Sequence, residues 1–235
     1  SKDNELEFLQ KVLAFKSHVL KYLKHEEYFE LCNYDKFVFS QNIPVPKGWK
    51  DLESFNIDLT KELEKLHLSK KQPFDQTLKN GTQTLDDLFF GNNLKNKCIL
   101  SLKNSLSIAI ENYRSRLEKN KEHPFLKNIP KALQINGSWS VRLNSDGYHT
   151  NHFHPKGLVS SAYYVSLPEF ISTDKTSKNG WLKFGQPGNN KFNLLPDKWI
   201  APKIGMLVLF PSYFWHGTEP FQNKKHRLTV AFDTI

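Results

Sequence analysis

The chain has 235 residues and a mass of 27.4 kDa, with 38% hydrophobic and 13% aromatic residues, which favours one folded globular core over a disordered chain. The net charge of +9 comes mainly from scattered lysines without an arginine-rich stripe, so we expect a solvated surface and no nucleic-acid partner. No apolar run approaches the roughly 20 residues that cross a bilayer, and no signal peptide opens the chain, so we expect no membrane partner and a cytoplasmic location.

The first half of the chain is predicted to be mainly helical. Apolar residues recur at helical spacing in 4–24, in 51–68 and in 94–120. We expect residues 1–33 to form a helical extension and residues 34–131 to form the helical first half of the main domain.

Two segments between these helices carry different patterns. The sequence FVFSQNIPVP (37–46) predicts a short strand that runs into a proline-rich turn. The sequence QPFDQTLKNGTQTLDDLFF (72–90) is polar and is expected to form a loop around Asn80 and Gly81.

From about residue 132 the pattern changes to short, β-rich runs. These runs are separated by Gly, Pro, Asn and Asp clusters, which is typical of an all-β sandwich or barrel: ALQINGSWSVRL, GLVSSAYYVSLP, GWLKFG, KIGMLVLFPS and HRLTVAFDTI. Residues 132–235 are therefore expected to be the β core of an α+β, mainly β, domain. The longest gap, EFISTDKTSKN (169–179), is expected to be a surface loop beside the binding site.

Three histidines fall within the short sequence YHTNHFHP. In an extended strand, residues two apart point to the same side, so His152 and His154 converge while Phe153 faces away. Two neutral imidazoles on one face suit iron, zinc, copper or nickel. His149 is three residues from His152, a poor spacing for ligation from a strand, and we leave it outside the metal site.

A third metal ligand is expected from a later strand. His216 follows the apolar run MLVLF and the turn PSYFW, so a buried strand would deliver it to the mouth of a cavity. Arg227 and Thr229 come shortly afterwards and share one face of a strand, away from Leu228. An arginine directed into an apolar barrel needs an anion to offset its desolvation, and a dicarboxylate would supply one.

These residues together resemble the Fe(II)/2-oxoglutarate oxygenases, which carry a His-x-acid pair, a distal His, and then an Arg with a Ser or Thr two residues later. The segments NHFHP, SSAYYVSLP, GWLKFG, GMLVLFPSYFWHGTEPF and RLTVAFD are similar to a bacterial and phage branch related to the prolyl hydroxylases, with His-x-His-Pro and Phe-Pro-Ser-x-x-x-His motifs. The resemblance covers roughly residues 34–235. It implies a double-stranded β-helix, or jelly roll, with N-terminal packing helices.

The resemblance also implies the metal and its ligands. His152, His154 and His216 fall at the positions that hold Fe(II). His154 departs from the wider superfamily, which has Asp or Glu there, and Asp146, Glu169, Glu219 and Asp233 lack the spacing to replace that acid. We expect ligation by all three histidines, with water in place of His154 as the alternative.

The 2-oxoglutarate site follows in the same way. Arg227 falls at the site of the distal carboxylate, Thr229 would assist it, and Tyr164 matches a strand tyrosine that reaches the same carboxylate. Tyr163 should face the opposite side. We expect Arg142, on the strand before His152, to meet the metal-side carboxylate or the substrate, with a surface salt bridge as the alternative.

The activity that this resemblance implies is a dioxygenase reaction that uses Fe(II), 2-oxoglutarate and O2. Succinate and CO2 are released, and an unactivated C–H bond of a small-molecule or peptidyl substrate is hydroxylated. Two alternatives stay open: a three-histidine dioxygenase that does not use 2-oxoglutarate, and a non-enzymatic β-barrel module that binds metal or nucleic acid. The sequence leaves the substrate and the oligomeric state open.

Overall fold

The computed structural model describes residues 2–68, 77–168, 171 and 176–235. Its helical elements lie mainly in the first half of the chain: α1 (Lys2–Tyr22), α2 (Glu27–Leu31), α3 (Tyr34–Phe37), α4 (Leu52–Glu64), η1 (Gly91–Lys95), α5 (Lys97–Arg116) and η2 (Leu126–Asn128). Their starts follow from local chemistry. The side chain of Asp51 caps α4 by accepting from the backbone of Ser54, and the Asn96 side chain accepts from two backbone N–H groups at the start of α5.

The strands form two antiparallel sheets. The larger sheet has the order β1-β7-β4-β9-β3-β2, and the smaller sheet has the order β6-β5-β8. The strand bounds are β1 (Phe39–Asn42), β2 (Leu78–Gln83), β3 (Ile135–His149), β4 (Val159–Ser166), β5 (Leu182–Phe184), β6 (Lys198–Ile200), β7 (Met206–Pro211), β8 (His216–Thr218) and β9 (Arg227–Thr234).

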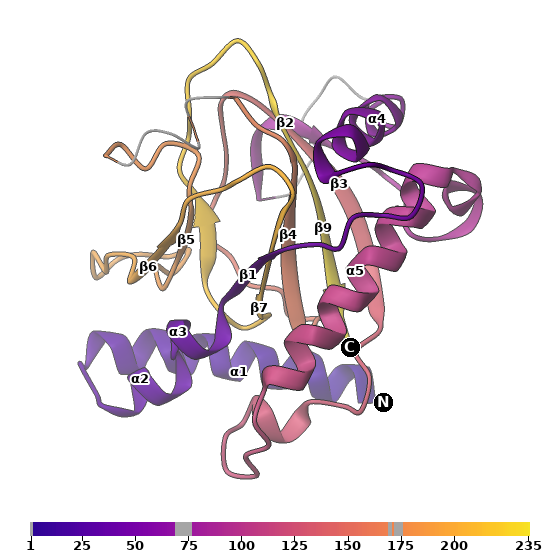
Figure 1. The fold of residues 1–235 in the computed structure, drawn as a ribbon. Helices are drawn as coiled ribbons and strands as arrows, with labels where there is room; N and C mark the ends of the chain where they lie inside the picture. The colour runs from indigo at the N-terminus through magenta and orange to yellow at the C-terminus, as the bar shows by residue number, and fades with distance from the viewer. Residues whose placement is uncertain (1, 69–76, 169–170, 172–175) are drawn as a thin grey trace.

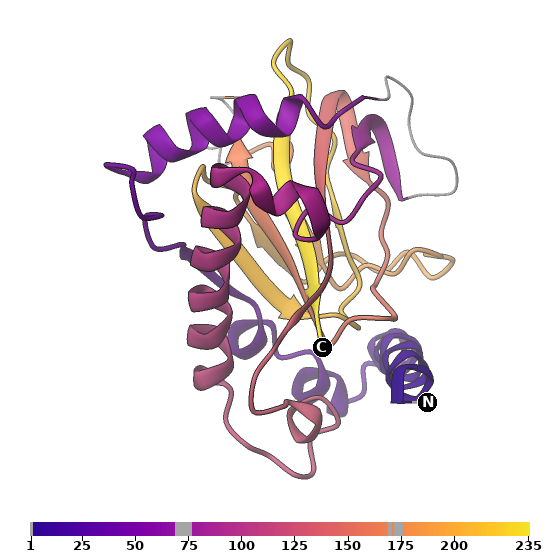
Figure 2. The same cartoon turned by 90° about the vertical axis from the view of Figure 1, so that its right-hand side faces the viewer.

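The larger sheet has two chemically different faces. Figure 1 shows α4 and α5 on one side of this sheet and the smaller sheet on the other, and Figure 2 shows the same helical layer from the side. Alternation along β4 sends Tyr163 toward α4, where its hydroxyl donates to Asn56 Oδ1, and Tyr164 toward the smaller sheet. The predicted division between these two tyrosines is confirmed.

Most of the predicted elements are present. The helices expected in 4–24, 51–68 and 94–120 are α1, α4 and α5, and the strand expected in 37–46 is β1. The loop expected around Asn80 is wrong, because residues 78–83 form β2 and pair with β3 at the edge of the larger sheet. The left-handed backbone at Asn80 and a register shift beside it explain the turn-like sequence. Most of the loop expected at 169–179 lies outside the described residues.

The N-terminal helix α1 lies across one end of the two sheets in both views (Figures 1 and 2). Leu13 and Ala14 of this helix are buried in the same apolar cluster as the strand residues, and Trp215 Nε1 donates to the Ala14 carbonyl. The boundary between an extension at 1–33 and a main domain at 34–235 stays a prediction. Among the described residues, no helix is long and apolar enough to cross a membrane.

Candidate active site

A cavity of about 500 Å³ lies between the two sheets. Its wall contains the three histidines that the sequence singled out, together with Tyr164, Arg227 and Thr229. A volume of this size is in the range of small-molecule sites. The strands β4, β8 and β9 and the segment that follows β3 therefore bring these predicted residues into one cavity.

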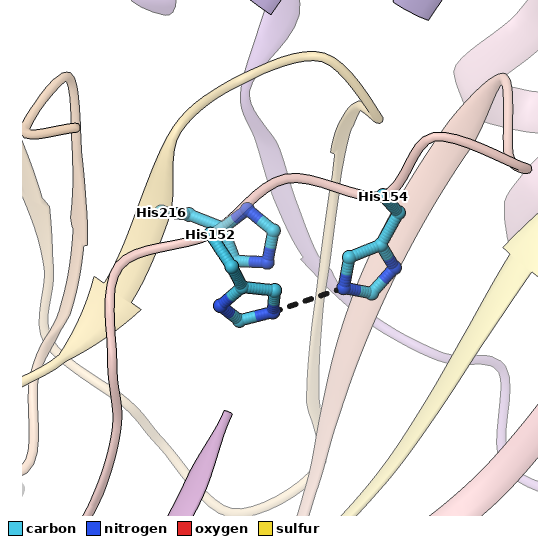
Figure 3. Close-up of side chains that lie close together, drawn as sticks. All are labelled: His152, His154 and His216. Carbon is cyan, nitrogen blue, oxygen red and sulfur yellow. Dashed lines mark hydrogen bonds between the residues drawn. The ribbon is translucent and has the colours of Figure 1, made fainter. Parts of the chain in front are cut away.

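The backbone holds His152 and His216 opposite each other. The two residues form an isolated antiparallel bridge, in which each backbone N–H donates to the other carbonyl at 2.8 Å. His154 is fixed two residues later, since its N–H donates to the Ser212 carbonyl at 2.9 Å. Figure 3 shows the three imidazoles turned toward one common point.

The hydrogen bonds of the Nδ1 atoms determine the tautomer of each ring. Nδ1 of His152 lies 2.7 Å from the Thr150 carbonyl, and Nδ1 of His216 lies 2.8 Å from the Phe214 carbonyl. Nδ1 of His154 lies 2.7 Å from a carboxylate oxygen of Asp233. All three partners only accept hydrogen bonds, so each Nδ1 carries a proton and each neutral ring presents its Nε2 lone pair to the others.

The separation of the Nε2 atoms fits a bound metal ion. His152 Nε2 and His154 Nε2 are 3.0 Å apart, the pair joined by the dashed line in Figure 3, and one ligand atom from each histidine lies within 4.8 Å of the others. Imidazole nitrogens bind such metals at about 2.1 Å, so two ligands at a right angle are about 3.0 Å apart. Two lone pairs at this distance repel each other unless a cation lies between them. The donor set therefore fits the metal that the sequence predicts.

Burial keeps these imidazoles in the form that binds metals. Desolvation lowers the pKa of His152 to about 3 and holds the pKa of His216 well below its usual value, with the neighbouring histidines as a second cause. His149, which the sequence left outside the metal site, lines the same cavity, and its pKa is also lowered by burial. Its Nδ1 lies 3.2 Å from Thr77 Oγ1.

A buried guanidinium lies in the same cavity. Arg227 is only 3% exposed, and its Nη1 donates to the Gly180 carbonyl at 3.0 Å, while its Nε has no hydrogen-bond partner in the part of the chain that the structure describes. Within the described part of the chain no carboxylate pairs with it, and its guanidinium lies 5.7 Å from the centre of the Tyr164 ring. Desolvation lowers the pKa of Arg227. A buried cation with free donors is a site for an anion.

Arg142 does not belong to this cavity. Its neighbour Val141 lines the pocket, so alternation along β3 turns Arg142 to the helical face of the larger sheet, where Nη1 donates to Glu64 at 2.8 Å. The structure does not bring Arg142 to the cavity in which we expected it to meet the metal-side carboxylate or the substrate. The alternative that we kept open, a salt bridge, is the arrangement present.

Asp233 is the residue that the sequence reasoning missed. It was set aside because it lacked the spacing of a metal ligand, yet it lines the cavity beside His154. A signal was present: Asp233 lies six residues after Arg227, an even number, so strand alternation places both side chains on one face of β9.

Comparisons with known proteins agree with this site. Residues 137–233 match the family model described as "Putative 2OG-Fe(II) oxygenase". No curated protein matches the chain by sequence.

Solved structures share the fold at low identity. The viral collagen prolyl hydroxylase of Paramecium Bursaria Chlorella virus-1, in complex with 2OG, matches with a TM-score of 0.53 and 13% identity, over 85% of this chain and 96% of that one. A prolyl hydroxylase from Trichoplax adhaerens, in complex with a hypoxia inducible factor peptide fragment, matches with a TM-score of 0.52 and 13% identity, over 99% and 91%. HygX from Streptomyces hygroscopicus, with nickel and 2-oxoglutarate bound, matches with a TM-score of 0.52 and 13% identity, over 87% of this chain and 85% of that one.

These similarities show the double-stranded β-helix that the sequence predicts. The family match contains all three histidines and the β9 strand from Arg227 to Asp233, and the three histidines converge as a metal site requires. The family-model match over residues 137–233, the shared fold and the three convergent histidines together indicate an oxygenase that uses Fe(II) and 2-oxoglutarate.

Proposed function

We propose that this enzyme hydroxylates an unactivated C–H bond of a small-molecule or peptidyl substrate, with Fe(II) held by His152, His154 and His216 and 2-oxoglutarate anchored by Arg227. The observation that carries the proposal is the pairing, in one cavity, of three convergent Nε2 lone pairs with a buried guanidinium that has no acidic partner among the described residues. A dicarboxylate that reaches from the metal to Arg227 satisfies both.

The anion end of the cavity supports this role. Thr229 and Tyr164 are register partners on adjacent strands, and both side chains line the cavity near Arg227. Neither hydroxyl has a hydrogen-bond partner among the described residues, so both are available to a carboxylate. Burial raises the pKa of Tyr164, and the phenol therefore keeps the proton that it would donate.

The chemistry comes from the bound groups, and the chain positions them. Fe(II) with 2-oxoglutarate and O2 supplies the oxidant and leaves succinate and CO2 as products. The chain orients the three imidazoles through their Nδ1 partners, supplies a cation for the distal carboxylate, and lines the space between with Phe210 and Leu182, which exclude water.

The substrate enters from the side of the cavity that is not used by these ligands. Trp139, Phe153 and the exposed Lys156 also line the cavity, and we expect the substrate to contact them. An aromatic surface with one cation at its mouth suits a small molecule or a peptide side chain, and the prolyl hydroxylases among the structural neighbours are a reason to include peptides.

An anaerobic Fe(II) titration with and without 2-oxoglutarate tests the proposal. We expect a weak visible charge-transfer band only when both are present, and succinate formation once O2 is admitted. Metal binding without the band, and no succinate above background, would exclude the use of 2-oxoglutarate and favour the three-histidine dioxygenase.

The variant Arg227→Ala tests the assignment of the anion site. It removes the carboxylate partner alone, so 2-oxoglutarate should bind about 100-fold more weakly, while the Kd of the metal changes little. Arg114→Ala, which removes a surface guanidinium paired with Glu111, is the matched control and should change neither value. Equal weakening of metal and 2-oxoglutarate by Arg227→Ala would contradict this role.

A further inference from the structure

The three imidazoles of the metal site differ in what holds their outer nitrogen. His152 and His216 each donate from Nδ1 to the main-chain carbonyl two residues earlier, which is an uncharged partner. His154 alone donates to a carboxylate, with Nδ1 at 2.7 Å and 2.9 Å from the two oxygens of Asp233. The charged partner therefore stands behind the one histidine that occupies the position of the acid in the resembling oxygenases.

Asp233 is a nearly buried carboxylate that the rest of the fold does not neutralise. It is 9% exposed, and Ser160 Oγ donates to its Oδ1 at 2.7 Å. His154 is its only ion-pair partner among the described residues, and no lysine or arginine pairs with it there. A carboxylate in such surroundings costs free energy unless a positive charge compensates it. A divalent ion on the far nitrogen of His154 supplies that charge.

The chain packs tightly to keep Asp233 and His154 in contact. Gly157, in the turn that follows His154, lies against Asp233 so closely that a Cβ would stand 2.9 Å from Asp233 Cβ and 2.7 Å from Ser212 Oγ. Ser212 Oγ in turn lies 2.8 Å from Ser160 Oγ. Ser160, Ser212 and Gly157 therefore pack around the Asp233 side chain that contacts His154.

We propose that Asp233 and His154 act together as one anionic ligand. The negative charge that an Asp or Glu at position 154 would place on the metal is supplied by Asp233, which acts on the metal through the His154 imidazole. Asp233 is a positioning residue in this proposal, because it touches the ligand and not the metal. It holds the ring with Nε2 toward the ion and raises the basicity of that nitrogen, as carboxylates behind metal-bound histidines do. The inference deepens the proposed function and rests on it for the identity of the metal site.

The first test measures the binding of Co(II) alone to the metal-free protein, since Co(II) accepts the same imidazole ligands. Asp233→Asn keeps the shape of the side chain and one acceptor but removes its charge. We expect the Kd of Co(II) to rise by about 10- to 100-fold. Asp58→Asn, which removes an exposed carboxylate on α4, is the matched control and should leave the Kd unchanged.

Stability of the metal-free protein separates this role from a structural one. The charge of Asp233 serves the metal in this proposal, so metal-free Asp233→Asn should fold and should unfold at the same temperature as the wild type or higher. A variant that fails to fold, or a folded variant whose Kd for Co(II) is within about twofold of the wild type, would overturn the inference.

A double variant tests whether Asp233 acts through His154. In His154→Asp/Asp233→Asn the acid returns to the ligand position and the outer charge is removed. We expect this protein to bind Co(II) within about tenfold of the wild type, whereas independent roles would make the two losses add. A double variant that binds as poorly as His154→Ala would also overturn the inference.

Failure of the proposed function has a different signature. In that case the wild-type protein would bind no Co(II), or it would bind Co(II) at a site that His216→Ala leaves intact. Co(II) binding on which 2-oxoglutarate has no effect would have the same meaning. Loss of the Asp233 effect alone leaves both of those wild-type results intact.

Discussion

Two polar clusters lie on opposite faces of the larger sheet, and they differ in where their partners are. On the helical face, Arg142 and His226 both pair with Glu64, and both ring nitrogens of His67 have hydroxyl partners. Among the described residues, Arg142 Nε and Glu64 Oε1 have no hydrogen-bond partner, although Glu64 Oε1 lies 2.6 Å from His226 Nε2. Most of this cluster is thus satisfied within the chain.

In the cluster on the cavity face, by contrast, key polar groups have no partner among the described residues. Three Nε2 lone pairs face one another, and Arg227 has no acidic partner in the described residues. Buried polar groups are normally paired, so groups that lack partners in the chain are the ones that await a ligand. Burial and charge alone do not mark a site, since both clusters have them. The site is marked by buried polar atoms that have no partner among the described residues.

The largest expected effect comes from removing one lone pair of the cavity cluster. His216→Ala should weaken the binding of Fe(II) or Co(II) by more than about 100-fold, because loss of a ligand exceeds the loss of a residue behind it. Calorimetric titration of the metal-free protein measures this. The unfolding temperature without metal should change little. Metal binding that survives the substitution would show that the ion sits elsewhere.

The next effect concerns pH and the helical face. Burial lowers the pKa of His67 to about 4. In the unfolded chain this imidazole is protonated below about pH 6.5, whereas in the folded chain it stays neutral until about pH 4. The contribution of His67 is therefore present at pH 7 and is lost as pH falls from about 6.5 to 4, by about 2 kcal/mol at pH 5. His67→Gln should remove this part of the dependence in denaturant unfolding at pH 7 and pH 5. An unchanged difference would contradict it.

The variant Arg227→Lys separates the charge of Arg227 from the shape of its guanidinium. The substitution keeps the charge and removes the planar fork of donors, so 2-oxoglutarate should bind about tenfold more weakly, less than the loss caused by Arg227→Ala. Metal affinity measured without 2-oxoglutarate should be unchanged. Equal effects of the Lys and Ala variants would mean that the fork, and not the charge, decides binding.

The smallest effect is expected from the closed cluster. Glu64→Gln should lower the free energy of unfolding by about 1 kcal/mol, because it weakens a partly exposed ion pair and leaves Arg142 with a weaker acceptor. The binding of metal and 2-oxoglutarate should not change. A change in either would show that the two faces of the sheet are coupled.

The sequence alone was enough to predict which histidines and which arginine would meet in one cavity, and the reason is local. The alternation of side chains along a strand relates His152 to His154 and Arg227 to Thr229 over two residues, whatever the rest of the fold does. The apolar strand before His216 and the helical periods of α1, α4 and α5 are signals of the same short range.

Residues whose partners are distant in the chain could be placed only from the folded structure. Asp233 meets His154 across 79 residues, and Arg142 meets Glu64 across 78. The register of β3 against β9 determines which face each side chain occupies, and that register depends on pairing between strands far apart in the sequence. The strand β2 could not be predicted for the same reason. Its sequence is typical of a turn, and it forms a strand because it pairs with β3 at the edge of the larger sheet.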